Sequence, residues 1–283
     1  KSIWQSMVKD TYWFGPAGII TFAISAIDIA LWDLLGKITG KPLYVLLGGS
    51  RDRVPCYYTG FRRSTPVGEL GEEALTMVRQ GFTAFKVKLG GEDTLEKEIE
   101  RVKAVREAIG DGYKVMVDPN QAWTADQTIM IGDSLEKYDI YWLEDPIPYE
   151  DMEGRVRVAS CLDIPIASGE DIYTRSQFRE LAENKAADIF NVDLQRVGGV
   201  TGWLDVTSFL EGRALPFAGH WFSEIQCHLF AASQKGLTLE YMPWHFGLYK
   251  QTPKIENGLI ELPKGPGLGW EIDEEALRRY EAK

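Results

Sequence analysis

The sequence has few cysteines, few histidines and no surplus of positive charge. Its three cysteines, Cys56, Cys161 and Cys227, lie far apart and form no CxxC pair, which argues against a disulfide framework and a cysteine zinc site. Lys and Arg total 31 against 42 Asp and Glu, giving a net charge of −11. This balance makes nucleic acid and anionic membranes poor partners. Together these features predict a cytoplasmic protein with reduced thiols.

Only one long hydrophobic run is present, at residues 18–36 (GIITFAISAIDIALWDLLG). It approaches the length of a membrane span. However, Thr21, Ser25, Asp28 and Trp32 recur at helical spacing, and Asp33 follows. A helix that faces lipid rarely carries two aspartates. The pattern therefore predicts a buried helix with one polar stripe.

After residue 50, short apolar runs alternate with helix-like segments rich in Glu, Ala, Leu, Lys and Arg. The runs recur every 20–30 residues or so, as strands joined by crossover helices require. The clearest helical segments are residues 96–110 and 174–187. Eight such strands favour a closed α/β barrel. An open doubly wound sheet is the alternative, but no GxGxxG follows the first run. The runs are residues 54–60, 84–90, 113–121, 140–147, 164–170, 188–194, 215–220 and 237–242.

The two ends of the chain differ from this pattern. Residues 1–50 are helical without strands, and residues 246–283 contain Pro and Gly turns followed by a short acidic helix. We therefore expect a barrel domain over residues 51–245. The two flanks are expected to form a smaller unit packed against the barrel.

Each predicted strand has a distinctive polar residue at or near its C-terminal end. The carboxyl ends of barrel strands meet at one face, where barrel enzymes keep their chemistry. Two cations, several acids and an imidazole should therefore converge at one mouth. In chain order they are Lys86 and Lys88, Asp118 and Asn120, Glu144 and Asp145, Glu170, Asp193, His220, and Glu240.

Three of the acids have a regular spacing: Glu144 follows Asp118 by 26 residues, and Glu170 follows Glu144 by 26. Carboxylates on neighbouring strands repel one another, and a divalent cation removes that repulsion. A donor set made only of oxygen favours Mg²⁺ over Zn²⁺. The alternative is three separate acids, solvated or capping helices. The equal spacing favours a metal site.

Lys86 and Lys88 lie two residues apart on one strand, so their side chains point to the same face. A neighbouring ammonium group and a divalent cation would lower the pKa of one lysine and make it a general base. The other lysine would stay charged and hold an anionic oxygen. One strand apart, Asp193 and His220 suggest an oriented imidazole base. The alternatives are salt bridges or exposure to water for the two lysines and a structural histidine for His220. Glu240, Asp145 and Asn120 have salt-bridge or capping roles as their alternatives.

A lysine and a histidine on nearly opposite strands can exchange protons on both faces of a planar carbon. The reaction that needs both a metal and a base is removal of the proton α to a carboxylate, which yields an enediolate. Mg²⁺ and Lys86 would neutralise its developing charge, and Glu240 in its acid form would donate a hydrogen bond.

The chain resembles the enolase superfamily and, within it, the mandelate racemase subgroup. The resemblance rests on an ordered set of motifs: KVK (86–88), DPNQAW (118–123), LEDP (143–146), SGE (168–170), RVGG (196–199), GH (219–220) and LEYM (239–242). It implies a modified (β/α)₇β barrel, with a capping domain built from both termini. Members usually begin with a longer cap, so the cap is expected to be truncated here and to lack its mobile lid.

The resemblance also implies roles for individual residues. Lys88 would be the base on one face, and His220, oriented by Asp193, the base on the other. Lys86 and Asn120 would contact the substrate carboxylate or support the metal shell, and Glu240 would be the hydrogen-bonding acid. The implied Mg²⁺ ligands are Asp118, Glu144 and Glu170.

The subgroup contains racemases and many acid-sugar dehydratases, and both begin with removal of the α proton. We expect a dehydratase acting on a sugar acid, with His220 as the acid that expels the β-hydroxyl. Arg62 and Trp221 are expected to contact the substrate. A racemase or epimerase of a 2-hydroxy acid is the runner-up, and a non-catalytic relative or a Schiff-base aldolase belongs to other classes. By analogy with barrel enzymes, we expect a homo-oligomer.

Overall fold

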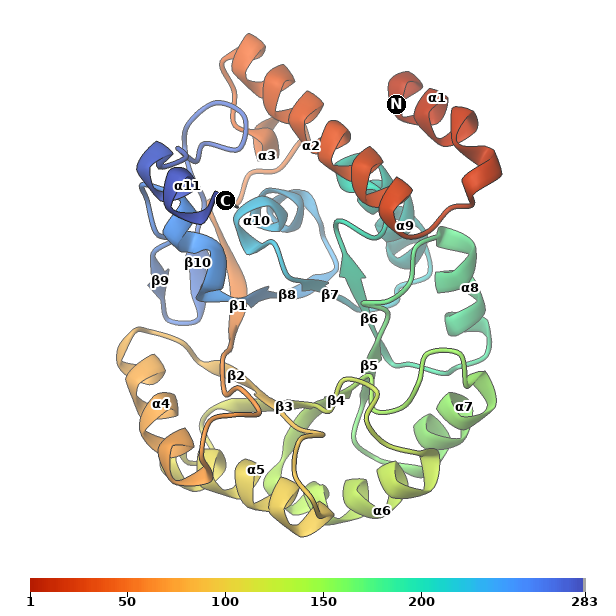
Figure 1. Ribbon diagram of the computed structural model, residues 1–283, viewed down its shortest axis with the longest axis vertical. Coiled ribbons are helices and arrows are strands. Elements are labelled where there is room, and N and C mark those ends of the chain that lie inside the picture. Colours follow the sequence, from red (N-terminus) through yellow and green to blue (C-terminus); the bar gives the residue numbers. More distant parts are fainter. Residues whose placement is uncertain (282–283) are drawn as a thin grey trace.

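The computed structural model describes residues 1–281, and a closed barrel of eight parallel strands forms its centre (Figure 1). Neighbouring strands pair in sequence order, and β1 pairs with both β2 and β8, which closes the ring. The predicted barrel is therefore confirmed. Its strands are β1 (Arg53–Thr59), β2 (Ala84–Lys88), β3 (Lys114–Asp118), β4 (Ile140–Glu144), β5 (Ile166–Ser168), β6 (Ile189–Asp193), β7 (Phe217–His220) and β8 (Gly236–Tyr241).

Seven helices connect the eight strands and surround the ring in Figure 1. The last strand is followed by the 3₁₀ helix η3 (Pro243–Leu248) rather than by an eighth barrel helix, so the order is (β/α)₇β, as predicted. Another 3₁₀ turn, η2 (Glu136–Tyr138), precedes β4. The connecting helices are α4 (Val67–Arg79), α5 (Leu95–Ile109), α6 (Ala125–Leu135), α7 (Met152–Cys161), α8 (Arg175–Glu183), α9 (Gly199–Gly212) and α10 (Ser223–Ala232).

The barrel interior has an apolar floor beneath a polar layer. The floor is one buried cluster that draws a residue from seven of the eight strands: Tyr57, Ala84, Met116, Trp142, Ala167, Ile189 and Ala218. Strand residues two apart share a face. The next inward residue toward the carboxyl end is therefore polar on most strands, as with Lys86, Asp118, Glu144 and His220. The alternation of the strands thus places the charged residues directly above this apolar cluster.

The N-terminal residues form α1 (Ser2–Asp10), η1 (Tyr12–Phe14), α2 (Ile19–Thr39) and α3 (Leu43–Leu46). Helix α2 packs against α9, where Asp28 accepts hydrogen bonds from the Thr201 amide (2.8 Å) and hydroxyl (2.7 Å). It is long and apolar enough to cross a membrane, judged by length and composition alone.

The prediction that this helix is buried was wrong in extent. Its polar stripe faces the barrel because Asp28 caps the start of α9, so the opposite, apolar face is turned outward. Ile19 is 77% exposed and Ile38 is 74% exposed.

The C-terminal residues add a hairpin, β9 (Ile255–Glu256) and β10 (Leu259–Glu261), and the helix α11 (Glu274–Tyr280). Strand β10 pairs antiparallel with β1, outside the barrel ring. Beyond it the chain meets the N-terminal residues, where Asp33 accepts a hydrogen bond from the Leu268 amide (2.8 Å) and Pro42 bridges to Gly267. The sequence did not predict the hairpin, because its strands are too short to show an alternation. The domain boundaries at residues 50 and 245 remain a prediction.

Candidate active site

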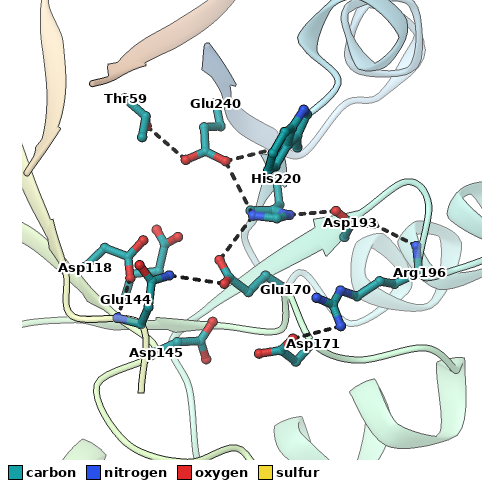
Figure 2. Close-up of polar contacts among 12 residues, drawn as sticks. Thr59, Asp118, Glu144, Asp145, Glu170, Asp171, Asp193, Arg196, His220 and Glu240 are labelled. Carbon is teal, nitrogen blue, oxygen red and sulfur yellow. Dashed lines mark hydrogen bonds and ion pairs between the residues drawn. The ribbon is translucent and has the colours of Figure 1, made fainter. Parts of the chain in front are cut away.

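The carboxyl ends of the barrel strands bring the predicted polar residues together at one mouth. Figure 2 shows Glu240, His220 and Glu170 facing one another, with Asp118 and Glu144 beside them. All five are buried. Each comes from a different strand or from the loop directly after it, so the barrel alone sets their relative positions.

Asp118, Glu144 and Glu170 form the only group of three His, Cys, Asp or Glu residues among residues 1–281 that could hold a metal ion. One oxygen from each lies within 4.8 Å of the others. Oxygens around Mg²⁺, bound at 2.0–2.1 Å, lie at most about 4.2 Å apart, so only small side-chain rotations are required. Glu170 Oε2 is buried and accepts no hydrogen bond, which leaves a lone pair for an ion. The residues therefore fit a hard cation.

Lys86 lies fully buried at the base of this acid cluster. Its Nζ is 3.2 Å from Asp118 Oδ2 and 2.6 Å from Glu240 Oε1, and it donates a short hydrogen bond to Glu144 Oε1. Burial lowers its pKa, but these carboxylates outweigh burial and raise the pKa well above its ordinary value. Lys86 is thus a buried positive charge that partly neutralises these three carboxylates.

Lys88 lies nearer the opening, with its side chain 13% exposed. Its Nζ donates to Asp118 Oδ2 (2.5 Å) and to Asn120 Oδ1 (3.2 Å). Burial lowers the pKa of Lys88, yet Asp118 and the other acids outweigh that effect and raise it. The protein's own groups therefore do not produce the expected lowering of the pKa of Lys88. Lowering this pKa requires a cation that neutralises the carboxylates.

His220 is held between three acids. Its Nδ1 lies 2.6 Å from Asp193 Oδ2, while Nε2 lies 3.3 Å from Glu170 Oε2 and 3.7 Å from Glu240 Oε2. An ionised Asp193 can only accept, so Nδ1 carries a proton and Nε2 faces the cluster. Burial lowers the pKa of His220, but Glu170 and the Asp193 hydrogen bond outweigh it and raise the pKa to about 10.

Glu240 accepts hydrogen bonds from the Thr59 hydroxyl (2.9 Å) and the Trp221 amide (3.0 Å). Burial raises its pKa, but the charges of Lys86 and His220 outweigh burial and lower it. The expectation that Glu240 acts in its acid form therefore remains a prediction, and these two cations oppose it. The cations around it favour the carboxylate, so Glu240 accepts hydrogen bonds rather than donating one.

Asp145, the acid next to Glu144, contacts Ser168 and Arg155. It accepts a short hydrogen bond from the Ser168 hydroxyl, and its Oδ1 lies 3.7 Å from Arg155 Nη2. Burial raises the pKa of Asp145 to about 7. Sequence reasoning offered a salt bridge as one alternative for this residue, but it missed Arg155, because an arginine within a barrel helix gives no signal that it points inward.

The rim carries Arg62 and two tryptophans. The Arg62 guanidinium lies 4.9 Å from the centre of the Trp244 ring, which packs edge-on against Trp221 at 5.9 Å. The Trp221 ring is in turn 6.2 Å from His220. A continuous row of packed side chains, a wall of the mouth, therefore runs from the His220 imidazole to the exposed Arg62 guanidinium. Arg63 instead donates to the backbone oxygens of Leu89 and Pro119.

Asn120 lies between Lys88 and the metal-binding acids. Its Nδ2 donates to Glu170 Oε1 at 3.4 Å, and its backbone amide donates to Asp118 Oδ1 at 2.9 Å. The residue has a φ of +47°, in the left-handed region that asparagine tolerates better than most residues. This turn directs the amide into the cluster rather than toward the solvent.

An eight-stranded barrel whose mouth holds three metal-binding carboxylates, flanked by a lysine and a histidine, defines a class of metal-dependent lyases and isomerases. The chain belongs to the enolase superfamily, as predicted. Residues 69–276 match the family "Enolase C-terminal domain-like". Residues 1–48 match the N-terminal domain of mandelate racemase and muconate lactonizing enzyme.

Several of the similar proteins are sugar-acid dehydratases, and others are cycloisomerases. The chain is 34% identical to the arabinonate dehydratase of Saccharolobus solfataricus, over 99% of this chain and 78% of the relative. It is 35% identical to the L-talarate/galactarate dehydratase of Salmonella typhimurium, over 93% and 66% respectively. The crystal structure of L-talarate dehydratase from Polaromonas, complexed with Mg and L-glucarate, superimposes with a TM-score of 0.90 at 33% identity, over 98% of this chain and 77% of that one.

Proposed function

We propose that this protein is a Mg²⁺-dependent hydro-lyase that removes water from a sugar acid. The observation that carries the proposal is the gathering of Asp118, Glu144 and Glu170 within 4.8 Å, between the amine of Lys88 and the imidazole of His220. Similar proteins that dehydrate sugar acids support the same reaction class. The structure of one of them was solved with Mg and a sugar di-acid.

We assign Mg²⁺ to Asp118, Glu144 and Glu170. When bound, it would polarise the substrate carboxylate and stabilise the negative charge of the enediolate. Lys86 stays charged beneath these acids, and Asn120 fixes the position of Glu170 through its side-chain amide. The protein's own charges thus complete an electrostatic setting that is fixed before the substrate binds.

Lys88 is the proposed base. In its neutral form, its Nζ takes the α proton of the substrate, and the electrons of the C–H bond pass into the enediolate. The β C–O bond then breaks, and protonated His220 supplies a proton from Nε2 to the leaving hydroxide, which departs as water. The resulting enol rearranges to a 2-keto-3-deoxy acid. His220 is suited to the acid role because its neighbours raise its pKa.

The substrate class follows from the same residues. Its reacting carboxylate would lie beside Lys88 and Asn120, and its hydroxyls would extend along Trp221 toward Arg62 at the rim. Arg62 provides a positive charge at the far end of this wall. We also expect a homo-oligomer, by analogy with barrel enzymes, and a cytoplasmic location, from the isolated cysteines.

A racemase or epimerase is the second candidate, because Lys88 and His220 lie on opposite sides of the acid cluster. The presence of Lys88, His220 and the three carboxylates at one mouth argues against a non-catalytic relative. The product separates these possibilities, since a dehydratase loses water and a racemase only inverts the α carbon.

The test is a screen of the purified protein with Mg²⁺ against sugar mono-acids and di-acids, including arabinonate, galactarate and gluconate. We expect a 2-keto-3-deoxy product, detected as its semicarbazone, that is lost with EDTA and in the K88M variant. Deuterium incorporation at C2 in D₂O without loss of water would favour the racemase. No turnover and no exchange with any acid would refute both.

A further inference from the structure

The backbone that follows His220 is held in an unusual conformation. Trp221 has a φ of +54° and Phe222 a φ of +40°, so two consecutive bulky residues adopt the left-handed region. Such a conformation is strained for a bulky residue and persists only where surrounding contacts enforce it. The groups that enforce it therefore also determine where the His220 ring points.

The side chain of Gln226, in the first turns of α10, makes those contacts. It is fully buried, and its Nε2 donates to the backbone oxygens of His220 (2.5 Å) and Trp221 (2.9 Å). Its Oε1 accepts from the indole N–H of Trp203 on α9 (3.1 Å). Both donors and the acceptor of the amide are used, so Gln226 is itself fixed in orientation.

A second contact holds the same peptide from the other side. The Trp221 amide donates to Glu240 Oε2 (3.0 Å), the carboxylate that also lies 3.7 Å from His220 Nε2. Gln226 also packs closely against Gly219, because a Cβ at that position would lie 2.8 Å from Gln226 Oε1. A relaxed Trp221 would swing its amide away from Glu240 and turn the imidazole away from Asp193.

We propose that Gln226 is a positioning residue for the imidazole of His220, acting through the strained turn at Trp221 and Phe222. This inference rests on the proposed role of His220. It assigns Gln226 no contact with the substrate or the metal. Its loss should disturb His220-dependent chemistry more than overall stability.

The test compares Q226M, which keeps the length of the side chain but removes its hydrogen bonds, with T207V as a matched control. Thr207 donates to the Trp203 backbone oxygen (2.9 Å) from α9 and is also buried, but it does not touch the turn. Imidazole ¹⁵N NMR reports His220 directly, since the chain has only 3 histidines. This readout requires neither substrate nor metal.

We expect the proton on Nδ1 of His220, bonded to Asp193, to shift upfield or exchange away in Q226M and to stay in place in T207V. With an active substrate, kcat should fall about 100-fold in Q226M while KM changes little, as for a misplaced catalytic group. A wild-type His220 signal in folded Q226M would overturn the proposal.

If Q226M does not fold, W203F decides, because phenylalanine keeps an aromatic ring against Phe217 and Phe230 but lacks the indole N–H that donates to Gln226 Oε1. A displaced His220 signal in W203F supports the proposed role of Gln226, and an unchanged signal overturns it. Absence of turnover in the wild-type protein would count against the proposed function, but it would leave the NMR comparison valid.

Discussion

Lys86 offers the sharpest test of how charge is balanced in the site. Its ammonium group is the only cation in contact with all three of Asp118, Glu144 and Glu240 among the described residues, and it is fully buried. Lys86→Met keeps the aliphatic stem and removes the charge alone. The three fully buried carboxylates would then lack their shared positive charge.

Breaking a buried ion pair by removing one partner typically costs about 3–5 kcal/mol. Part of that cost is avoided if a carboxyl takes up a proton, and Glu144 is the candidate because burial already raises its pKa to about 8. We therefore expect the lower end, ~3 kcal/mol at neutral pH, and a larger loss above pH 8. For a chain of this size, ~3 kcal/mol corresponds to a fall in Tm of roughly 6–10 °C.

A divalent cation should reverse much of this loss. Mg²⁺ bound to Asp118, Glu144 and Glu170 supplies the positive charge that K86M lacks. A ligand at 100 times its Kd stabilises the folded state by about 2.7 kcal/mol. The gain in Tm with Mg²⁺ should be larger in K86M than in the wild-type protein, because the variant carries more uncompensated negative charge.

The assay is thermal unfolding in EDTA and in excess Mg²⁺. K103M is the matched control, because Lys103 undergoes the same chemical change at an exposed pair with Glu107 (3.8 Å). An exposed pair of this kind contributes about 0.5 kcal/mol or less. If K86M lost no more stability than K103M in EDTA, or gained no more from Mg²⁺ than wild type, the reasoning about the buried charges would be refuted.

Three further predictions follow from the same geometry. H220N should lower kcat/KM by ~10²–10⁴-fold yet still exchange the α proton in D₂O. K88M should abolish that exchange, and exchange by K88M would contradict the assignment of Lys88 as the base. R62M should lower kcat/KM for galactarate about 10–100-fold and spare gluconate, measured side by side, and equal losses would remove Arg62 from recognition of the distal carboxylate. Because burial raises the pKa of Glu144 to about 8, the folded state without metal loses stability as pH rises toward that value. Mg²⁺ binding needs the carboxylate and therefore strengthens over the same range. The Mg²⁺-induced gain in Tm should therefore be larger at about pH 8.5 than at about pH 6, and equal gains would contradict this.

The barrel was predictable because its signals are local. Alternating apolar residues mark each strand, and the predicted run at 84–90 became β2 (Ala84–Lys88) with both lysines inside the mouth. The spacing of Asp118, Glu144 and Glu170 predicted their meeting, because one repeat of strand and helix separates each pair. Such inferences need only the periodicity of the strands and the rule that parallel strands end together.

The charge states were not predictable, because they depend on sums over residues that are distant in sequence. Glu240 was expected as an acid, but Lys86 and His220 lower its pKa. The outward face of α2 and the strained turn after His220 have a similar origin. Each follows from one partner, Asp28 or Gln226, whose contact across the fold leaves no periodic signal in the sequence.

The same carboxylates have two opposite effects on Lys88. Asp118 and its neighbours raise its pKa and so hold the amine protonated, which is the wrong state for a base. These carboxylates are also the ones placed to bind a divalent cation, and a cation there would cancel the field that keeps the proton on Lys88. On the proposed assignment of Lys88 as the base, binding the ion and activating the base are therefore a single electrostatic event. Such a site gains its base only when it also has the charge that stabilises the enediolate, so proton abstraction without that stabilisation is suppressed.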